Sequence, residues 1–418
     1  MKRLLLLYLA TLCWGFGQSQ GLLQSSMDYI QPLDSIQSTV LQDHVAKIGA
    51  QATIVGLGEV SHYTKECYEF KQAIIETLME QGYQALILEV DFGQALIWND
   101  YVTKGIGNLD AIIRESGWFT YRTEEFKALL NYIRSFNQTA ATPFQIFGME
   151  MTAMNHNLDW LKQYFSKNLD QNEAILKALE VERKIVAFYQ YDQEEQQDYW
   201  SLFYQVQNTL VENESSLTKK GGALNYEIAQ RISEIIRQYA TFISHDDFRF
   251  KVEIRDLFST RNVLWTMDQL GEDSKVVIWA HNGHVAKRSI MFDYDVLGHQ
   301  LEQIFDDAYY SIGFTFDRGE FGAFSSQGWG RWTLSELDTP SLTTAFRALN
   351  HPYLLFDIRS FAQQDQSPQS FLRQPQLIRR DLSESYEADF PTTMEIVLSE
   401  TYDSLLYIDQ ITYPTTVD

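Results

Sequence analysis

The residues best suited to chemistry in this sequence are acids and histidines that directly follow apolar, strand-like runs. They are Glu59 and His62 after residues 52–57, Glu89 and Asp91 after residues 85–88, and His281 and His284 after residues 275–279. In open parallel sheets, ligands bind beyond the carboxyl ends of the strands. We therefore expect these acids and imidazoles to meet at one edge of a sheet.

This combination of side chains suits hydrolysis by an activated water molecule. Because an unperturbed histidine titrates near neutrality, His62 can take a proton from water. A carboxylate from Glu59 or Glu89 can hold the tautomer of His62 and stabilise the imidazolium. His281 or His284 can then polarise a carbonyl or contact the developing oxyanion. The set favours general-base catalysis without a covalent nucleophile.

Other kinds of catalysis have sequence motifs that this chain lacks at the expected places. No Gly-x-Ser-x-Gly elbow or Gly-x-Gly-x-x-Gly loop follows a strand-like run, and there is no P-loop and no His-Glu-x-x-His zinc motif. Two histidines three residues apart can still chelate a divalent ion together with carboxylates. A metal-dependent amide or peptide hydrolase is therefore an alternative, and a ligand-binding homologue without turnover is another.

A helix between two strands must position the first of these residues. Apolar side chains recur at spacings of three and four over residues 64–80, and Gly82 follows, which predicts a helix ending there. The strand–helix–strand order predicts parallel strands joined by a right-handed crossover. Further strands are expected at residues 144–148, 275–279, 309–316, 353–357 and 405–411, and further helices at residues 37–48, 94–102 and 123–136.

Residues 155–270 differ from the rest because they show helical periodicity without strand-like runs. No proline occurs between Pro143 and Pro340, which favours long helices. The predicted fold class is α/β, with a parallel-rich central sheet, flanking helices and a helical insertion over the carboxyl edge of the strands. The predicted parts are a signal peptide at 1–20, the first part of an α/β core at 21–154, the helical insertion at 155–270 and the second part of the core at 271–418.

The N-terminus has the layout of a secretory signal peptide. Lys2 and Arg3 precede an apolar run at residues 4–14, and small and polar residues follow up to residue 20. The run is too short to anchor the mature chain in a membrane, so a secreted or periplasmic location is expected. Cys67 is then the only cysteine of the mature chain, and we interpret it as a buried packing residue.

The composition excludes some partners. The formal net charge is −23, and no basic cluster interrupts it, so nucleic acid is not expected as a partner. A hydrophobic content of 45% is ample for a packed core. The oligomeric state does not follow from these numbers.

The candidate residues also lie in blocks that resemble the erythromycin esterase family. The signature blocks are Gly58-Glu59-Val60-Ser61-His62, Leu88-Glu89-Val90-Asp91 and Trp279-Ala280-His281-Asn282-Gly283-His284. Supporting blocks are Trp118 with residues 119–134 and Asn137, Arg255-Asp256 with Asn262, and Ile312-Gly313-Phe314-Thr315-Phe316 with Gly319. The resemblance covers most of residues 50–325.

The resemblance implies metal-independent hydrolysis of a macrolide lactone by water, without a cofactor, on an α/β core with a helical part over the cleft. It implies that His62 is the general base, that Glu59 and Glu89 are its carboxylate partners, and that His281 and His284 form a second histidine pair.

Substrate contacts are expected from the aromatic loop at Trp118 and Arg122, and from Lys71 and Glu150. The last two depart from the family pattern, which has arginine at the first position and Gly-x-Asp where this chain has Gly148-Met149-Glu150. Lysine keeps the charge but lacks the planar fork of arginine. The substrate is therefore expected to be a small-molecule ester or lactone, which need not be a macrolide.

Overall fold

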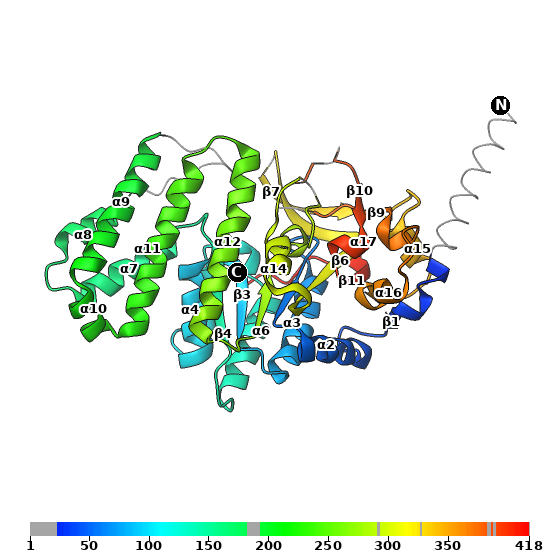
Figure 1. The fold of residues 1–418 in the computed structure, drawn as a ribbon, viewed down its shortest axis with the longest axis horizontal. Coiled ribbons are helices and arrows are strands. Elements are labelled where there is room, and N and C mark those ends of the chain that lie inside the picture. The colour runs from blue at the N-terminus through cyan, green and yellow to red at the C-terminus, as the bar shows by residue number, and fades with distance from the viewer. Residues whose placement is uncertain are drawn as a thin grey trace, which may run out of the picture. The chain divides into compact units, whose positions relative to one another are not determined.

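The computed structural model describes residues 23–181, 193–290, 293–326, 328–382, 386–387 and 390–417. It has a mixed α/β fold with a mostly parallel central sheet flanked by helices, as the sequence predicts (Figure 1). The chain divides into two compact units, the first made of Met1–Gln84, Thr120–Tyr132 and Asp273–Asp418, and the second of Ala85–Phe119 and Ile133–Glu272. The predicted signal peptide lies outside the described residues, and the domain boundaries expected from the sequence stay a prediction.

The first unit contains most of the strands. These are β1 (Ile30–Leu33), β2 (Ile54–Leu57), β5 (Val276–Trp279), β6 (Tyr309–Ser325), β7 (Gly328–Leu334), β8 (Tyr353–Asp357), β9 (Pro375–Arg379), β10 (Thr393–Val397) and β11 (Ser404–Ile411). Their order in this part of the sheet is β1-β8-β11-β6-β2-β5, with β7 paired to β6, and β9 and β10 form a separate ribbon. The pairs from β11 through β6 and β2 to β5 are parallel, whereas β1–β8, β8–β11, β6–β7 and β9–β10 are antiparallel.

The parallel pairing of β2 with β5 places the first site. All residues of both strands are buried, and Leu57 pairs with Trp279 at their carboxyl ends. Because the two strands end in register, the turns that follow them begin side by side. The strands that pair with β2 are β5 and β6. The strand that follows α3 in the sequence, β3, therefore does not pair with β2.

The helices of the first unit include the one predicted after the Glu59–His62 turn. They are α2 (Thr39–Gln51), α3 (Lys65–Glu80), α13 (Asn282–Val285), α14 (Leu297–Phe305), α15 (Leu342–Arg347), α16 (Ile358–Gln364) and α17 (Leu398–Thr401), with short 3-10 turns at Met27–Tyr29, Asp306–Ala308 and Phe371–Arg373. Beyond the end of α3, Gly82 adopts a φ of 83°, a conformation that glycine tolerates without steric strain.

The second unit contains a parallel pair of strands and most of the long helices. Its elements are β3 (Ala85–Asp91), α4 (Phe92–Lys104), α5 (Leu109–Arg114), β4 (Gln145–Glu150), α7 (Asn155–Asn168), α8 (Glu173–Ala178), α9 (Gln193–Glu212), α10 (Glu214–Gly221), α11 (Ala223–Ile243) and α12 (Phe248–Leu270). Figure 1 shows α9, α11 and α12 side by side, in green. The 3-10 turn Phe119–Tyr121 and α6 (Glu124–Asn137) contain residues of both units. Within the described ranges, none of the helices combines the length and apolarity that crossing a bilayer requires.

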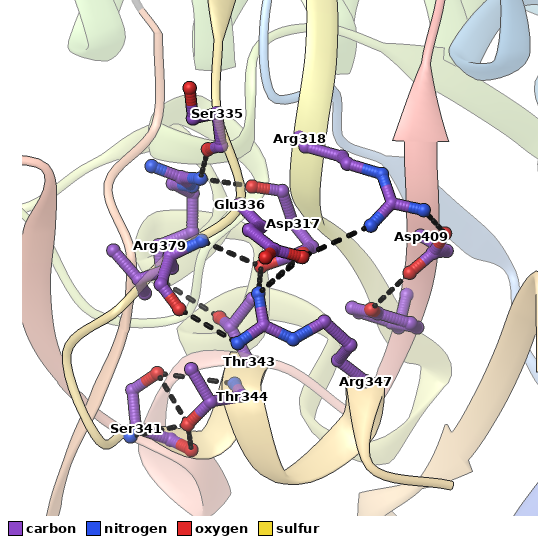
Figure 2. A network of polar contacts seen from close by, with 12 residues as sticks. Asp317, Arg318, Ser335, Glu336, Ser341, Thr343, Thr344, Arg347, Arg379 and Asp409 are labelled. Atoms are coloured by element: carbon purple, nitrogen blue, oxygen red, sulfur yellow. Dashed lines mark hydrogen bonds and ion pairs between the residues drawn. The ribbon is translucent and has the colours of Figure 1, made fainter. Parts of the chain in front are cut away.

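A buried ion-pair network holds the C-terminal part of the first unit together (Figure 2). The carboxylate of Asp317 on β6 is fully buried and accepts two hydrogen bonds from Arg347 Nη1, at 2.9 and 3.2 Å. The guanidinium of Arg379, at the end of β9, donates to the carbonyl oxygens of Asp317 and Ser335, and its backbone N–H donates to Thr343 Oγ1 at 2.9 Å. The end of β9 is therefore fixed to β6 and α15.

Candidate active site

The turn after β2 carries Glu59 and His62. A Cβ atom built on Gly58, at its start, would lie 2.1 Å from Asn282 Oδ1, so glycine is required for this close approach. The backbone N–H of Asn282 donates to the carbonyl oxygen of Glu59 at 3.0 Å. The turn after β2 is therefore bonded directly to the turn after β5.

The Glu59 carboxylate is 2% exposed and accepts hydrogen bonds on both oxygens. Oε1 lies 2.6 Å from His62 Nδ1, and Oε2 accepts from Lys71 Nζ at 2.6 Å and from Trp279 Nε1 at 2.9 Å. Burial raises the pKa of Glu59, but the charge of Lys71 and the hydrogen bonds from His62 and Lys71 outweigh it, so the pKa lies below its ordinary value. Glu59 is therefore an ionised carboxylate at neutral pH.

The bond to Glu59 orients the imidazole of His62. An ionised carboxylate can only accept hydrogen bonds, so Nδ1 must carry the hydrogen and Nε2 is the basic nitrogen. The side chain of His62 is 16% exposed. The hydroxyl of Tyr68 lies between the carbonyl oxygens of His62, at 2.9 Å, and of Thr120, and its single hydrogen serves one of them at a time.

A fully buried lysine contacts Glu59 and packs against the ring of Trp279. Lys71, on α3, is 0% exposed, and its ammonium lies 4.3 Å from the centroid of the Trp279 ring. The rings of Tyr68, Tyr121 and Phe126 surround Trp279 at centroid distances of 5.2, 6.1 and 6.2 Å. The substrate-binding role expected for Lys71 stays a prediction, and in the structure its ammonium contacts Glu59.

The turn after β5 brings a second imidazole to His62. The ring centroids of His62 and His281 lie 5.3 Å apart. His281 is 7% exposed and caps α13, with its Nδ1 accepting a hydrogen bond from the N–H of Gly283 at 3.3 Å. A ring nitrogen that accepts carries no hydrogen, so the neutral His281 ring has its N–H at Nε2. His284 lies one turn further on, half-buried, with its N–H bonded to the carbonyl oxygen of His281 at 3.0 Å.

In the second unit, Glu89 and Glu150 share one arginine. Glu89 is 6% and Glu150 is 1% exposed, and Arg255 of α12 lies between them, with Nη2 2.7 Å from Glu89 Oε1 and Nε 2.5 Å from Glu150 Oε2. The other oxygen of Glu150 accepts from the N–H groups of Met151 and Thr152 at 2.8 and 2.9 Å. Both predicted carboxylates are therefore buried as ion pairs with the same guanidinium.

A further acid–imidazole pair in the second unit was not predicted from the sequence. Asp91 is fully buried, and its Oδ2 accepts from Trp118 Nε1 at 2.8 Å and lies 3.2 Å from His156 Nδ1. Its Oδ1 accepts from the N–H of Gln94 at 2.9 Å and caps α4. The sequence places Asp91 at a strand end but contains no signal that joins it to His156.

Two other predictions concern side chains of the first unit. Cys67 is a buried free thiol whose pKa burial raises to about 12, which confirms its interpretation as a packing residue. Arg122 is half-buried, and its charge acts on the Tyr63 hydroxyl; its expected contact with substrate stays a prediction. Among the described residues, no group of three or more His, Cys, Asp or Glu side chains is arranged to hold a metal ion.

The structure thus brings Glu59, His62, Lys71 and His281 together in one unit, and Glu89 with Glu150 in the other. Sequence reasoning missed Arg255 as their common partner, although it identified the Arg255-Asp256 block, and it missed Trp279 as a donor to Glu59. A tryptophan at the carboxyl end of β5 was a usable signal, because a buried indole N–H requires an acceptor.

Comparisons with known proteins show what this chain is similar to. The curated relatives include erythromycin esterase type II of Escherichia coli, 23% identical over 303 residues, which cover 66% of this chain and 72% of that protein. They also include a putative hydrolase, YbfO, of Bacillus subtilis, 20% identical over 416 residues, with 92% and 90% covered.

Similar solved structures include a Bacillus cereus protein with a TM-score of 0.79 and 25% identity, covering 96% of this chain and 99% of that one. A second is an erythromycin esterase mutant in its open conformation, with a TM-score of 0.68, 17% identity and coverage of 93% and 99%. The second likeness, at its low identity, shows the fold alone.

The family model for erythromycin esterase matches residues 78–411. This range contains Glu89, Glu150, His281 and His284, and it begins after Glu59 and His62. The match covers most of the chain, and the relatives named above agree with it. The chain belongs to the erythromycin esterase family of hydrolases.

Proposed function

We propose that this chain hydrolyses an ester or lactone bond of a small molecule with a water molecule activated by His62. The observation that carries the proposal is the arrangement of Glu59, His62 and His281, with a 2.6 Å contact between the first two and 5.3 Å between the two imidazole centroids. Membership of the erythromycin esterase family supports a hydrolase, and the name of the Escherichia coli relative supports an ester bond.

In the first step, His62 acts as a general base. Its Nε2 takes a proton from water as the water oxygen forms a bond to the carbonyl carbon of the substrate. The imidazolium that forms is stabilised by the ionised Glu59 carboxylate on Nδ1. General-base catalysis of this kind typically contributes about 10²- to 10⁴-fold in rate.

In the second step, the tetrahedral intermediate collapses. We assign His281 as the donor to the oxyanion, a contact worth about 10²- to 10³-fold in related chemistry. The carbon–oxygen bond to the alcohol then breaks, and the alkoxide receives the proton from the His62 imidazolium. An ester gives a carboxylic acid and an alcohol, a lactone gives one hydroxy acid, and the enzyme regains its starting state.

The other predicted residues take supporting parts in this proposal. The ammonium of Lys71 keeps Glu59 ionised. We therefore propose that Lys71 positions the Glu59 carboxylate. Glu89 remains a proposed catalytic carboxylate and His284 the second member of the histidine pair. Glu150, Trp118 and Arg122 remain proposed substrate contacts.

The test is a comparison of His62→Asn and His281→Asn with the wild type over a panel of simple esters, lactones and a macrolide. We expect His62→Asn to lose about 10²- to 10⁴-fold in kcat/KM and His281→Asn to lose about 10²- to 10³-fold. His351→Asn is the matched control, because His351 is exposed. A wild type whose turnover survives His62→Asn undiminished would refute the proposed base. Loss of turnover after dialysis against a chelator would favour the metal-dependent alternative.

We also propose that residues 1–20 direct export and are removed. The support is the Lys2-Arg3 start followed by an apolar run and small residues. Mass spectrometry of the protein recovered from the periplasm or medium of a producing cell should show a mature N-terminus near residue 21. An intact N-terminus on protein recovered from the cytoplasm would contradict this.

A further inference from the structure

A short segment after β9, residues 379–382, contacts both turns of the proposed site. One end is fixed by Arg379, which is bonded to Asp317, Ser335 and Thr343 (Figure 2). At the other end, the N–H of Leu382 donates to the carbonyl oxygen of Val60 at 2.7 Å. The segment is therefore joined to the Glu59–His62 turn by a backbone hydrogen bond.

The side chain of Asp381 in this segment contacts the second turn. Its Oδ1 accepts a hydrogen bond from Asn282 Nδ2 at 3.0 Å. Asn282 is the residue after His281, and its amide also bonds both backbone groups of Phe314, at 2.8 and 3.0 Å. Asn282 also donates its backbone N–H to the carbonyl oxygen of Glu59. Asp381 therefore contacts the residue that joins the His281–His284 turn to the Glu59–His62 turn.

The surroundings of Asp381 do not favour a charged carboxylate. Its Oδ2 is shielded from solvent and has no hydrogen-bond partner in the described part of the chain. The groups that face it are the Asn282 amide of α13, the Tyr402 hydroxyl after α17 and the Met394 sulfur of β10, which accepts the N–H of Asp381 at 3.5 Å. Burial raises the pKa of Asp381 to about 8, against the bond from Asn282 and the charge of Arg380. The neutral acid is therefore the form that fits this place at pH 7.

We propose that Asp381 is a positioning residue which, as a neutral acid, holds the Asn282 amide and with it the His281–His284 turn against the Glu59–His62 turn. The proposal rests on the proposed function for its kinetic readout. The neutral acid accepts from Asn282 on one oxygen and carries its own hydrogen on the other. After ionisation, the shielded carboxylate would keep one neutral hydrogen-bond donor, Asn282, with the charge of Arg380 near it. Its burial would still favour movement of the segment toward water and away from Asn282.

The kinetic test compares Asp381→Asn and Asp381→Ala with the wild type between pH 5 and 10. Asparagine keeps an acceptor for Asn282 and cannot ionise, so it should keep wild-type kcat at pH 7 to within about twofold. It should also remove the alkaline loss of activity that we expect near pH 8 in the wild type. Asp381→Ala should lower kcat about 10- to 100-fold with little change in KM, because a misplaced group loses about this much. Asp338→Asn, in an exposed loop, is the control.

A second readout does not need turnover. The imidazole C–H resonances of His281 and His284, assigned through single His→Asn variants, should shift between pH 7 and 9 in the wild type and lose that shift in Asp381→Asn. An unchanged alkaline limb and unchanged imidazole titration in Asp381→Asn would overturn the proposal. A wild type that cleaves nothing on the panel but shows the Asp381-dependent imidazole shift would refute the proposed function and support this positioning role.

Discussion

Replacing Lys71 by methionine should remove the stability that the buried ion pair with Glu59 provides. Methionine nearly matches the length of the lysine side chain and keeps its packing on Trp279, so the main loss is the charge. In the wild type the ammonium and the carboxylate lie 2.6 Å apart, with exposures of 0% and 2%. Among the described residues, the variant would leave Glu59 with His62 and Trp279 as its donors.

The expected magnitude follows from this burial. Removing one partner of a buried ion pair typically costs about 3 to 5 kcal/mol, because an uncompensated charge remains inside. Lys104 and Asp100 offer a matched comparison, with an N–O distance of 2.7 Å but exposures of 61% and 42%. Exposed pairs of this kind contribute about 0.5 kcal/mol or less, so Lys104→Met should be nearly neutral.

The pH dependence has a definite sign. In the wild type the lowered pKa of Glu59 adds stability above the unfolded value, and this stability is lost as pH falls through the folded value. Without Lys71, burial, already the largest single influence on Glu59, is opposed by the bond and charge of His62 alone, so we expect the pKa of Glu59 to rise relative to the wild type. The stability difference between Lys71→Met and the wild type should therefore be largest near pH 8 and shrink toward about pH 4.3, the ordinary glutamate value.

Urea denaturation of the wild type, Lys71→Met, Lys104→Met and the double variant Glu59→Gln/Lys71→Met would measure these differences. The double variant should be more stable than Lys71→Met at pH 8, since it no longer buries an unpaired carboxylate. The reasoning is refuted if Lys71→Met matches Lys104→Met in its denaturation midpoint, or if its deficit grows as the pH is lowered.

Three further outcomes are expected. Gly58→Ala should lower kcat/KM by at least about tenfold, because its methyl group would displace the turn after β5. Gly330→Ala is the control: a Cβ atom at Gly330 would have no heavy atom nearer than 3.5 Å, so turnover should be unchanged. Cys67, whose pKa burial raises to about 12, should resist iodoacetamide at pH 8 in the folded protein and react in urea; fast labelling of the native protein would contradict this. Arg347→Leu should lower the free energy of unfolding by about 3 kcal/mol, since it leaves the buried Asp317 carboxylate without its ion-pair partner. A thermal midpoint equal to that of the wild type would count against this.

The strands and helices that position the site were largely predictable because their patterns are local. The strand at residues 353–357 is β8 as predicted, and the helix expected at residues 64–80 is α3, Lys65–Glu80. The expectation that His62 and His281 meet at a carboxyl edge followed from two strand ends and is met by the 5.3 Å contact. Strands β1, β7, β9 and β10 were missed because they are short, or exposed along much of their length.

The partners of the buried charges could not be predicted because they depend on packing between distant segments. Nothing in the sequence joins Lys71 to Glu59 or Arg255 to both Glu89 and Glu150. The same holds for His156 with Asp91, and for Asp381 with Asn282. In each case a buried carboxylate requires donors, but which donor meets it is decided by the tertiary fold. Sequence reasoning identified Glu59, Glu89, Glu150, His62, His281 and His284 as candidates, but not His156 or Asp381. Apart from the pairing of His62 with Glu59, the donors to these carboxylates came from the structure.

The pairing of β2 with β5 has a consequence for how the protein folds. Val55 and Val277 are register partners about 220 positions apart. Closing a chain segment of that length costs on the order of 5 kcal/mol in entropy by the logarithmic loop rule, more than two four-residue strands can offset alone. The histidine turns should therefore assemble late, after the intervening residues have been synthesised and have collapsed. A ribosome-bound chain truncated before β5 would carry Glu59 and His62 without the turn that contains His281 and His284.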